Sequence, residues 1–258
     1  MTMTVSAQTL TQEYFLIAAR ISGLVFSAPV LSSSYLPRML KVVIIIMLAA
    51  VLAPTLKIAA MPSLLWTLGL VIQFAIGVLM GLILSLFLSV FDMAGQVVTY
   101  ELGLGLAITS NPALDNSGSF LSEWQTLLAL FVFVGSGGLE LSVIALHASF
   151  QAIGLNVVSF PTSALSFVIG LMSSALTMTL LVAFPLMLAG LVVNMAVGIL
   201  SRAFPQMNAY FLSLPVNFGV SLLVFAAMIP ILVGILPEFW NHAFVDVSRL
   251  LAILEGKS

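Results

Sequence analysis

The segment LSVIALHASFQAIGLNVVSFPTSALSFVIGLMSSALTMTLLVAFPLMLAGLVVNMAVGILS, Leu141 to Ser201, has sixty-one residues and no Asp, Glu, Lys or Arg. After the lone Arg202, a second uncharged run continues from Ala203 to Pro237. A water-soluble domain needs charged side chains on its surface. A membrane protein is surrounded by hydrocarbon instead. Placing a charged residue at the centre of a transmembrane helix costs about 2.5–3.5 kcal/mol on insertion scales. The sequence therefore predicts an all-α, polytopic helical membrane protein.

The composition of the whole chain agrees with this prediction. Of 258 residues, 62% are hydrophobic and 6% are charged, and the mean hydropathy is +1.26. Soluble domains have roughly 25% charged residues. A net charge of -2 without a Lys/Arg cluster predicts no nucleic-acid partner. The absence of cysteine excludes disulfides, thiolate metal sites and cysteine nucleophiles. Because residues 1–12 lack a positive n-region and Arg20 interrupts the first apolar run, we expect retained spans and no cleaved signal peptide.

Apolar segments divide the chain into expected helices of one membrane domain, residues 1–258. About twenty helical residues cross the hydrocarbon core of a bilayer. The expected segments are Glu13–Leu31, Val42–Leu56, Ile58–Phe91, Trp124–Val134, Leu139–Ile153, Thr162–Ser201 and Gln206–Pro237. The third is long enough that it must tilt or continue beyond the lipid against protein, and the fourth and fifth are each too short to cross. Residues 239–258 mix charges with apolar residues and predict a short amphipathic helix at an interface.

A row of small residues lies in the long third segment at four-residue spacing. Its members are Gly77, Gly81, Ser85 and Ser89. At this spacing they share one helix face and allow another backbone to approach closely. The row predicts a helix-packing surface, either within this chain or at a contact between subunits.

A glycine-rich stretch begins after Asp92. Glycine or proline stands at Gly95, Gly103, Gly105, Pro112 and Gly118, and apolar residues alternate with them at Leu104, Leu106 and Ile108. This density of glycine and proline predicts irregular backbone. At membrane depth such backbone is tolerated only where protein buries it or a cavity wets it. We therefore expect these residues to line or block a passage, with a plain solvent-exposed connector as the alternative.

Residues that could carry chemistry do not form a catalytic or metal-binding motif. His147 and His242 lie far apart, and Ser136 between two glycines has His147 eleven residues away. No catalytic, cofactor or metal site is predicted. The acids Asp92, Glu101, Glu123 and Glu140 fall at the ends of apolar runs or in the glycine-rich stretch, where they can be solvated or cap helices. A proton-coupled secondary transporter that uses Glu101 or Glu140 remains the rival class.

The segment from Leu191 to Phe211 resembles the signature of the FliR family, the export-gate proteins of the bacterial flagellar type III secretion apparatus. It carries a helix of small residues, then Leu-Ser-Arg at 200–202, Pro-Gln-Met-Asn at 205–208, an aromatic and apolar run, and Pro215. Upstream, the stretch from Gly95 through Gly103, Ala107, Asn111 and Pro112 is similar to the plug-loop region of the family. The resemblance covers essentially the whole chain in length and in the order of its segments.

Departures from the family pattern distinguish its two branches. Family members often carry Asp where this chain has Asn111, and some carry His where Leu139 stands. The injectisome counterparts, the SctT family, share the Arg–Pro-Gln turn but typically have an acid near Asn194 and a Lys near Asn217. Both positions are neutral amides here, which favours the flagellar branch.

The resemblance implies a subunit of a gated pore that conducts unfolded flagellar proteins across the bacterial inner membrane at the basal body. It implies assembly with FliP and FliQ, contacts with FlhB, FlhA, unfolded substrates and membrane lipid, and no cofactor or enzymatic activity. Residues 1–160 would be a FliP-like part with a plug loop at about 103–118, and residues 161–238 a FliQ-like hairpin, in a superhelical hetero-oligomer. The expected plug or pore-lining residues are Gly103, Leu104, Gly105, Leu106, Ala107, Ile108, Asn111 and Pro112.

The expected tip of the hairpin is the turn with Arg202, Pro205, Gln206 and Asn208. Arg202 is either a cation that anchors a helix end to water or lipid phosphate, or part of a surface that docks a partner subunit, as the resemblance implies. Lys would keep the anchor but lose the planar, bidentate donor geometry of Arg. The few cations near the end of the chain favour a cytoplasmic C-terminus.

Overall fold

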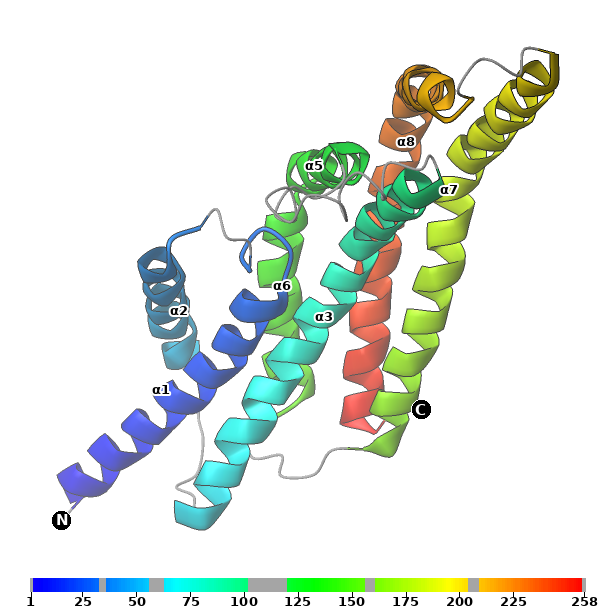
Figure 1. Cartoon of the computed structure of the whole chain (residues 1–258). Helices are drawn as coiled ribbons and strands as arrows, with labels where there is room; N and C mark the ends of the chain where they lie inside the picture. The colour runs from blue at the N-terminus through cyan, green and yellow to red at the C-terminus, as the bar shows by residue number, and fades with distance from the viewer. Residues whose placement is uncertain are drawn as a thin grey trace. The chain divides into compact units, whose positions relative to one another are not determined.

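The structure is a computed structural model, and it describes residues 2–32, 36–55, 63–101, 120–155, 161–203 and 209–256. The helices in these ranges are α1 (Thr2–Ser27), α2 (Arg38–Leu52), α3 (Ser63–Glu101), α5 (Phe120–Gly135), α6 (Gly138–Ala152), α7 (Thr162–Ala203) and α8 (Ala209–Glu255). A 3-10 turn, Ala53–Thr55, follows α2. The described residues contain no strand, so the predicted all-α class is confirmed (Figure 1).

Three helices are long and apolar enough to cross a membrane, in the stretches Leu65–Tyr100, Ser163–Ala203 and Pro215–Glu255. The two shorter helices α5 and α6, with a bend of 65° between them, would add a fourth crossing if together they form one broken span. Gly137 lies at this break with φ +78°, a left-handed conformation that glycine adopts without a steric penalty. These candidate spans confirm the prediction of a polytopic helical membrane protein.

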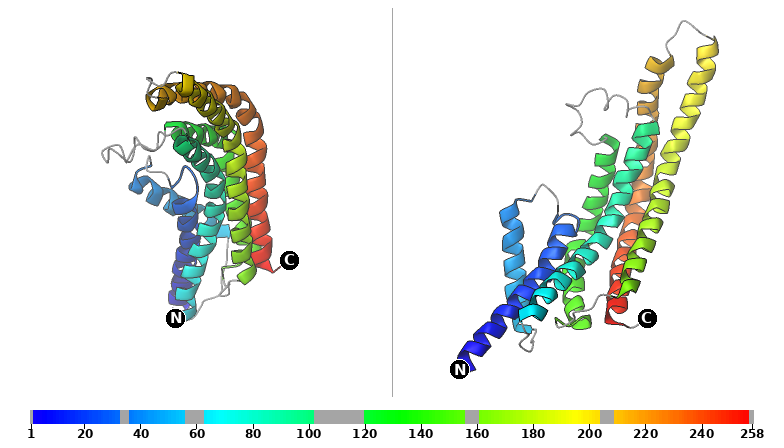
Figure 2. Two further views of the ribbon diagram at one scale, coloured as in Figure 1. Left: turned by 45° about the vertical axis from the view of Figure 1, so that its right-hand side comes forward. Right: turned by 60° about the horizontal axis from the view of Figure 1, so that its bottom comes forward.

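The chain forms two compact units, and the first contains Met1–Phe87, Val134–Met172 and Phe239–Ser258. Within this unit α1 and the first part of α3 run parallel and side by side, and α2 flanks α1 (Figures 1 and 2). Aliphatic side chains of α1, α3 and α6 with 1% exposure or less form its core. They include Ile17, Ile21, Ile76, Met80, Ile83 and Leu146.

The last part of α8 belongs to the first unit and buries one helix face. Trp240, Ala243, Val247 and Leu250 recur at helical spacing and are at most 1% exposed. This segment is amphipathic, but it is not a separate short helix, because α8 continues into it without interruption to Glu255. Long apolar helices accommodate internal prolines by local adjustment of the backbone, so Pro237 does not end the helix.

The second unit contains Leu88–Phe133 and Ser173–Glu238. In it α7 and α8 form a long antiparallel hairpin (Figure 2). Only 28% of the apolar window in the α7 span and 22% of that in the α8 span are buried, against 44% in α3. The apolar side chains of the hairpin therefore face lipid or other proteins, because water would leave this surface unstable.

The helix α3 extends farther than the glycine pattern predicts. Gly95 was expected to begin irregular backbone, but α3 continues through Gly95 to Glu101. A methyl group at Gly95 would collide with the backbone of Ser122 on α5. The prediction is wrong at this position because Gly95 allows two helices of the second unit to approach closely, which offsets its low helix propensity.

Candidate functional site

Helices α1 and α3 meet backbone to backbone in the first unit. A methyl group at Gly77 would collide with the carbonyl oxygen of Arg20, and one at Gly81 would lie 2.7 Å from the amide nitrogen of Ala28. From the other side, a methyl group at Gly23 of α1 would collide with the backbone of α3. We call this contact the glycine seam. It permits an approach that no residue with a side chain would allow.

The glycine seam uses the first half of the small-residue row. Ser85 and Ser89 are half-buried, and Ser85 Oγ donates a 2.9 Å hydrogen bond to the carbonyl of Leu82 in its own helix. On α1 the complementary row is Ala19, Gly23 and Ser27, also at four-residue spacing. That second row is visible in the sequence and is the signal that pairs α1 with α3.

Arg20, whose carbonyl belongs to the glycine seam, has a fully buried side chain. Its Nε donates to Gln73 Oε1 at 2.7 Å, its Nη1 to the carbonyl of Ser149 at 2.7 Å, and its Nη2 to the carbonyl of Ile153 at 3.0 Å. The guanidinium also lies 4.4 Å from the ring centroid of Phe150. One side chain thus joins α1, α3 and the end of α6.

The acceptors around Arg20 are neutral: the side-chain amide of Gln73 within α3, and the carbonyls of Ser149 and Ile153 at the end of α6. The last carbonyls of a helix lack partners within the helix and carry partial negative charge, so a cation is stabilised there. Gln73, whose Oε1 accepts from Arg20, donates from Nε2 to the carbonyl of Leu155 at 3.2 Å. In the part of the chain that the structure describes, the one ion pair is between Arg249 and Asp246, so no carboxylate neutralises Arg20 directly. We call Arg20, Gln73, Ser149 and Ile153 the arginine cluster.

A second polar contact joins the two helices of the hairpin. Asn217 of α8 is 2% exposed, and its Nδ2 donates a 2.8 Å hydrogen bond to Asn194 Oδ1 on the exposed side of α7. Ser221, one turn farther along α8, is also buried. The two positions that the family resemblance predicts to differ between its branches therefore contact each other.

The structure locates only part of the predicted functional set. Arg202 is exposed in the last turn of α7, where the helix dipole favours a cation. The other predicted residues of the hairpin tip and the plug lie outside the described residues. They are Gly103, Leu104, Gly105, Leu106, Ala107, Ile108, Asn111, Pro112, Pro205, Gln206 and Asn208. Their predicted roles stay predictions.

Two further groups of polar side chains have partners nearby. Asp92 accepts hydrogen bonds from Ser122 Oγ and Gln96 Nε2, and His147 Nε2 lies 3.1 Å from Gln151 Nε2. Among the described residues no three His, Cys, Asp or Glu side chains are grouped as metal ligands. The geometry of the described residues supports helix packing and partner contact.

Residues 11–243 match the protein family described as bacterial export proteins, family 1. The chain is 26% identical to the flagellar biosynthetic protein FliR of Escherichia coli K12 over 243 residues, 93% of this chain and 91% of that protein. It is 23% identical to FliR of Caulobacter vibrioides over 81% of this chain and 85% of that protein. The surface presentation of antigens protein SpaR of Salmonella typhimurium is 29% identical over 80% of this chain and 78% of that protein.

Proposed function

This chain belongs to the bacterial export proteins, family 1, and from that membership we propose that it is a pore-forming subunit of the flagellar type III protein export gate. It is a component of the flagellar export apparatus, is embedded in a membrane and works with other proteins of the apparatus. It is a structural protein and not an enzyme. Its membership in an export-protein family favours this role over the stand-alone transporter. The extent of the family match, from residue 11 to residue 243, carries the proposal because it includes α3, α5, α6 and α7 and most of α8.

The proposed partners are FliP and FliQ in the core gate, with FlhB and FlhA around it, in the bacterial inner membrane. The exposed apolar surface of the α7–α8 hairpin supports assembly, since both helices bury less than a third of their apolar windows within the chain. In this proposal residues 161–238 form a FliQ-like hairpin and residues 1–160 a FliP-like part. Residues Gly103–Pro112 line or plug the pore and yield to unfolded flagellar proteins.

The experiment that tests this function is deletion of the gene and complementation with the cloned chain. We expect the deletion to abolish motility and the secretion of flagellar proteins, and the cloned chain to restore both. Blue-native electrophoresis of gently solubilised membranes should place the chain in a large mixed complex with FliP and FliQ. A lone or homodimeric species in a strain with normal motility would contradict the proposal.

An injectisome role is the second candidate, favoured by the 29% identity to SpaR. The neutral pair Asn194–Asn217 favours the flagellar role. By the family resemblance, injectisome members typically have an acid near the first position and a lysine near the second. Complementation distinguishes the roles: we expect rescue of a FliR deletion in a flagellated host and no rescue of a SpaR deletion.

A further inference from the structure

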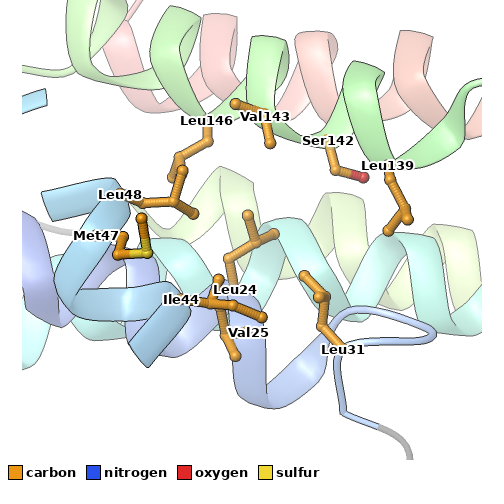
Figure 3. A pocket seen from close by; sticks show the side chains of 10 residues that line it. All are labelled: Leu24, Val25, Leu31, Ile44, Met47, Leu48, Leu139, Ser142, Val143 and Leu146. Atoms are coloured by element: carbon orange, nitrogen blue, oxygen red, sulfur yellow. The ribbon is translucent and has the colours of Figure 1, made fainter. Parts of the chain in front are cut away.

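An apolar cavity of about 330 Å³ opens among α1, α2 and α6 in the first unit. Nine apolar side chains and one hydroxyl, that of Ser142, line it, and they converge from the three helices and, at Leu31, from the turn after α1 (Figure 3). The Ser142 hydroxyl donates at 2.7 Å to the carbonyl of Gly138, so it is satisfied within its own helix. The lining therefore offers almost nothing to water.

The size of the cavity indicates a ligand larger than a single small apolar molecule. A cavity of about 150 Å³ with an aliphatic and aromatic lining stays dry and accepts a benzene molecule. This cavity has about twice that volume and lies within the range of about 300–1,000 Å³ that is usual for ligand sites. In a membrane-embedded chain, the abundant apolar ligand of this kind is a lipid acyl chain.

A buried cation lies beside the cavity. Lys41 of α2 is 8% exposed, and its Nζ donates at 2.9 Å to the carbonyl of Ser32, the residue after the lining residue Leu31. Ile44 and Leu48, which also line the cavity, follow Lys41 by three and seven residues and share its helix face. Lys41 thus lies at one end of the cavity.

The charge on Lys41 has no carboxylate partner in the described part of the chain, where the one ion pair involves other residues. An ammonium carries three donors, and a mostly buried charge is stabilised only when it is paired or fully hydrogen-bonded. Arg38, one turn before Lys41 on α2, is exposed and adds a second positive charge. This end of the cavity therefore favours an anion.

We propose that this cavity is a site for an anionic phospholipid, with an acyl chain among α1, α2 and α6 and the phosphate at Lys41 and Arg38. The apolar lining and the cationic end are separated along α2 in the same order as the chain and the headgroup of a phospholipid. Basic residues at the membrane surface select anionic headgroups, whereas a headgroup with its own cation is repelled by the two positive side chains. This site is independent of the proposed pore.

Native mass spectrometry of the purified full-length chain tests the site. The probes are dioleoylphosphatidylglycerol and dioleoylphosphatidylcholine, added in equal amounts. We expect one phosphatidylglycerol to be retained in preference to phosphatidylcholine, and Lys41→Gln to reduce that preference about fivefold, as expected for one cation near a surface. Lys41→Arg should retain it. Equal retention of the two lipids by the unmodified chain would overturn the proposal.

A matched pair of variants on α2 tests the apolar part. Leu48→Trp fills the cavity and should lower the retention of both lipids, whereas Ile46→Trp, at an exposed residue outside the lining, should leave it unchanged. Lipid retention by Leu48→Trp at the unmodified level would overturn the assignment. A photocrosslinker at Met47, a lining residue that is 63% exposed, should label lipid in intact membranes. Preferential capture of another protein chain there would show that a subunit occupies the cavity instead.

Discussion

Asn217 on α8 donates a 2.8 Å side-chain hydrogen bond to Asn194 on α7. Between Leu165 and Gly198, α7 has no charged side chain and no amide side chain other than Asn194. Interhelical hydrogen bonds of this kind contribute about 0.6–2 kcal/mol in membrane proteins. An amide pair needs no compensating charge, so it holds the hairpin together without the desolvation cost of an ion pair. Substitutions at this contact therefore test the stability of the hairpin and the predicted difference between the flagellar and injectisome branches.

The first prediction concerns this pair. Asn217→Lys should strongly lower the amount of assembled complex, because it buries a cation against a neutral acceptor. Asn194→Asp alone should have a small effect, since the carboxylate still accepts from Asn217. The double variant should recover assembly by forming an ion pair, as measured by co-purification of FliP and FliQ. A double variant no better than Asn217→Lys would show that the two positions are uncoupled.

The second prediction concerns the arginine cluster. Arg20→Met should destabilise the chain by at least about 3 kcal/mol, because it removes several charged hydrogen bonds and takes the donor away from the carbonyl of Ile153, whereas the carbonyl of Ser149 keeps the N–H of Ile153. Arg20→Lys should recover only part of this loss, since an ammonium cannot reach acceptors on two helices at once. The measurement is thermal unfolding of the purified chain in detergent. The control is Arg249→Met at a 67% exposed side chain, with an expected change below about 1 kcal/mol.

The third prediction concerns the glycine seam. Gly81→Leu should separate α1 from α3 at a cost of about 1–3 kcal/mol and lower both complex yield and motility. The matched control is Gly170→Leu on α7, because a methyl group at Gly170 has no neighbour within 4 Å among the described residues. Thermal unfolding of the isolated chain separates the two variants. Equal stability of both would contradict the importance of the seam.

The fourth prediction concerns the loop Gly103–Pro112. Changing Leu104, Leu106 and Ile108 together to Ser should leave the gate assembled but leaky, because an apolar loop excludes water and ions without a fixed directional partner. Conductance of the purified complex in planar bilayers, or sensitivity of cells to impermeant small solutes, measures the leak. Co-purification of FliP and FliQ is the control for assembly. If the variant assembles normally and the membrane does not leak, the loop is a structural connector and not a plug.

The fifth prediction concerns Arg202 at the end of α7. Arg202→Lys should keep the charge at the helix end but reduce secretion with assembly intact, because docking requires the planar fork of guanidinium. Secretion of flagellar proteins and co-purification are measured on the same cells. Full secretion by Arg202→Lys would identify the side chain as a simple anchor.

The fold class and the long spans follow from the sequence because uncharged runs such as residues 163–201 have one stable environment, the membrane. Helix ends were harder to predict where glycine has two opposite uses. At Gly137 it breaks the chain through a positive φ, and at Gly95 it continues a helix because Ser122 lies against it. Gly137 stands in the cluster Gly135-Ser136-Gly137-Gly138, which marks the break in the sequence, whereas the single Gly95 is explained only by its tertiary contact with Ser122.

The arginine cluster could not be predicted from the sequence for a different reason. The acceptors of Arg20 on α6 include the backbone carbonyls of Ser149 and Ile153, which every residue type possesses and which lie 129 and 133 residues away. The available signals were Arg20 and Gln73, two polar side chains each alone in an apolar segment. Each signal indicated a buried polar contact but did not identify its partner.

The glycine seam also determines which part of the chain can deform. Two helices in backbone contact have no layer of side chains between them that could change rotamers, so α1 and the first part of α3 must tilt or shift together. The helix that carries this contact ends at Glu101, directly before the predicted plug. In the proposed gate, the predicted plug would therefore follow a helix whose first part shifts only together with α1.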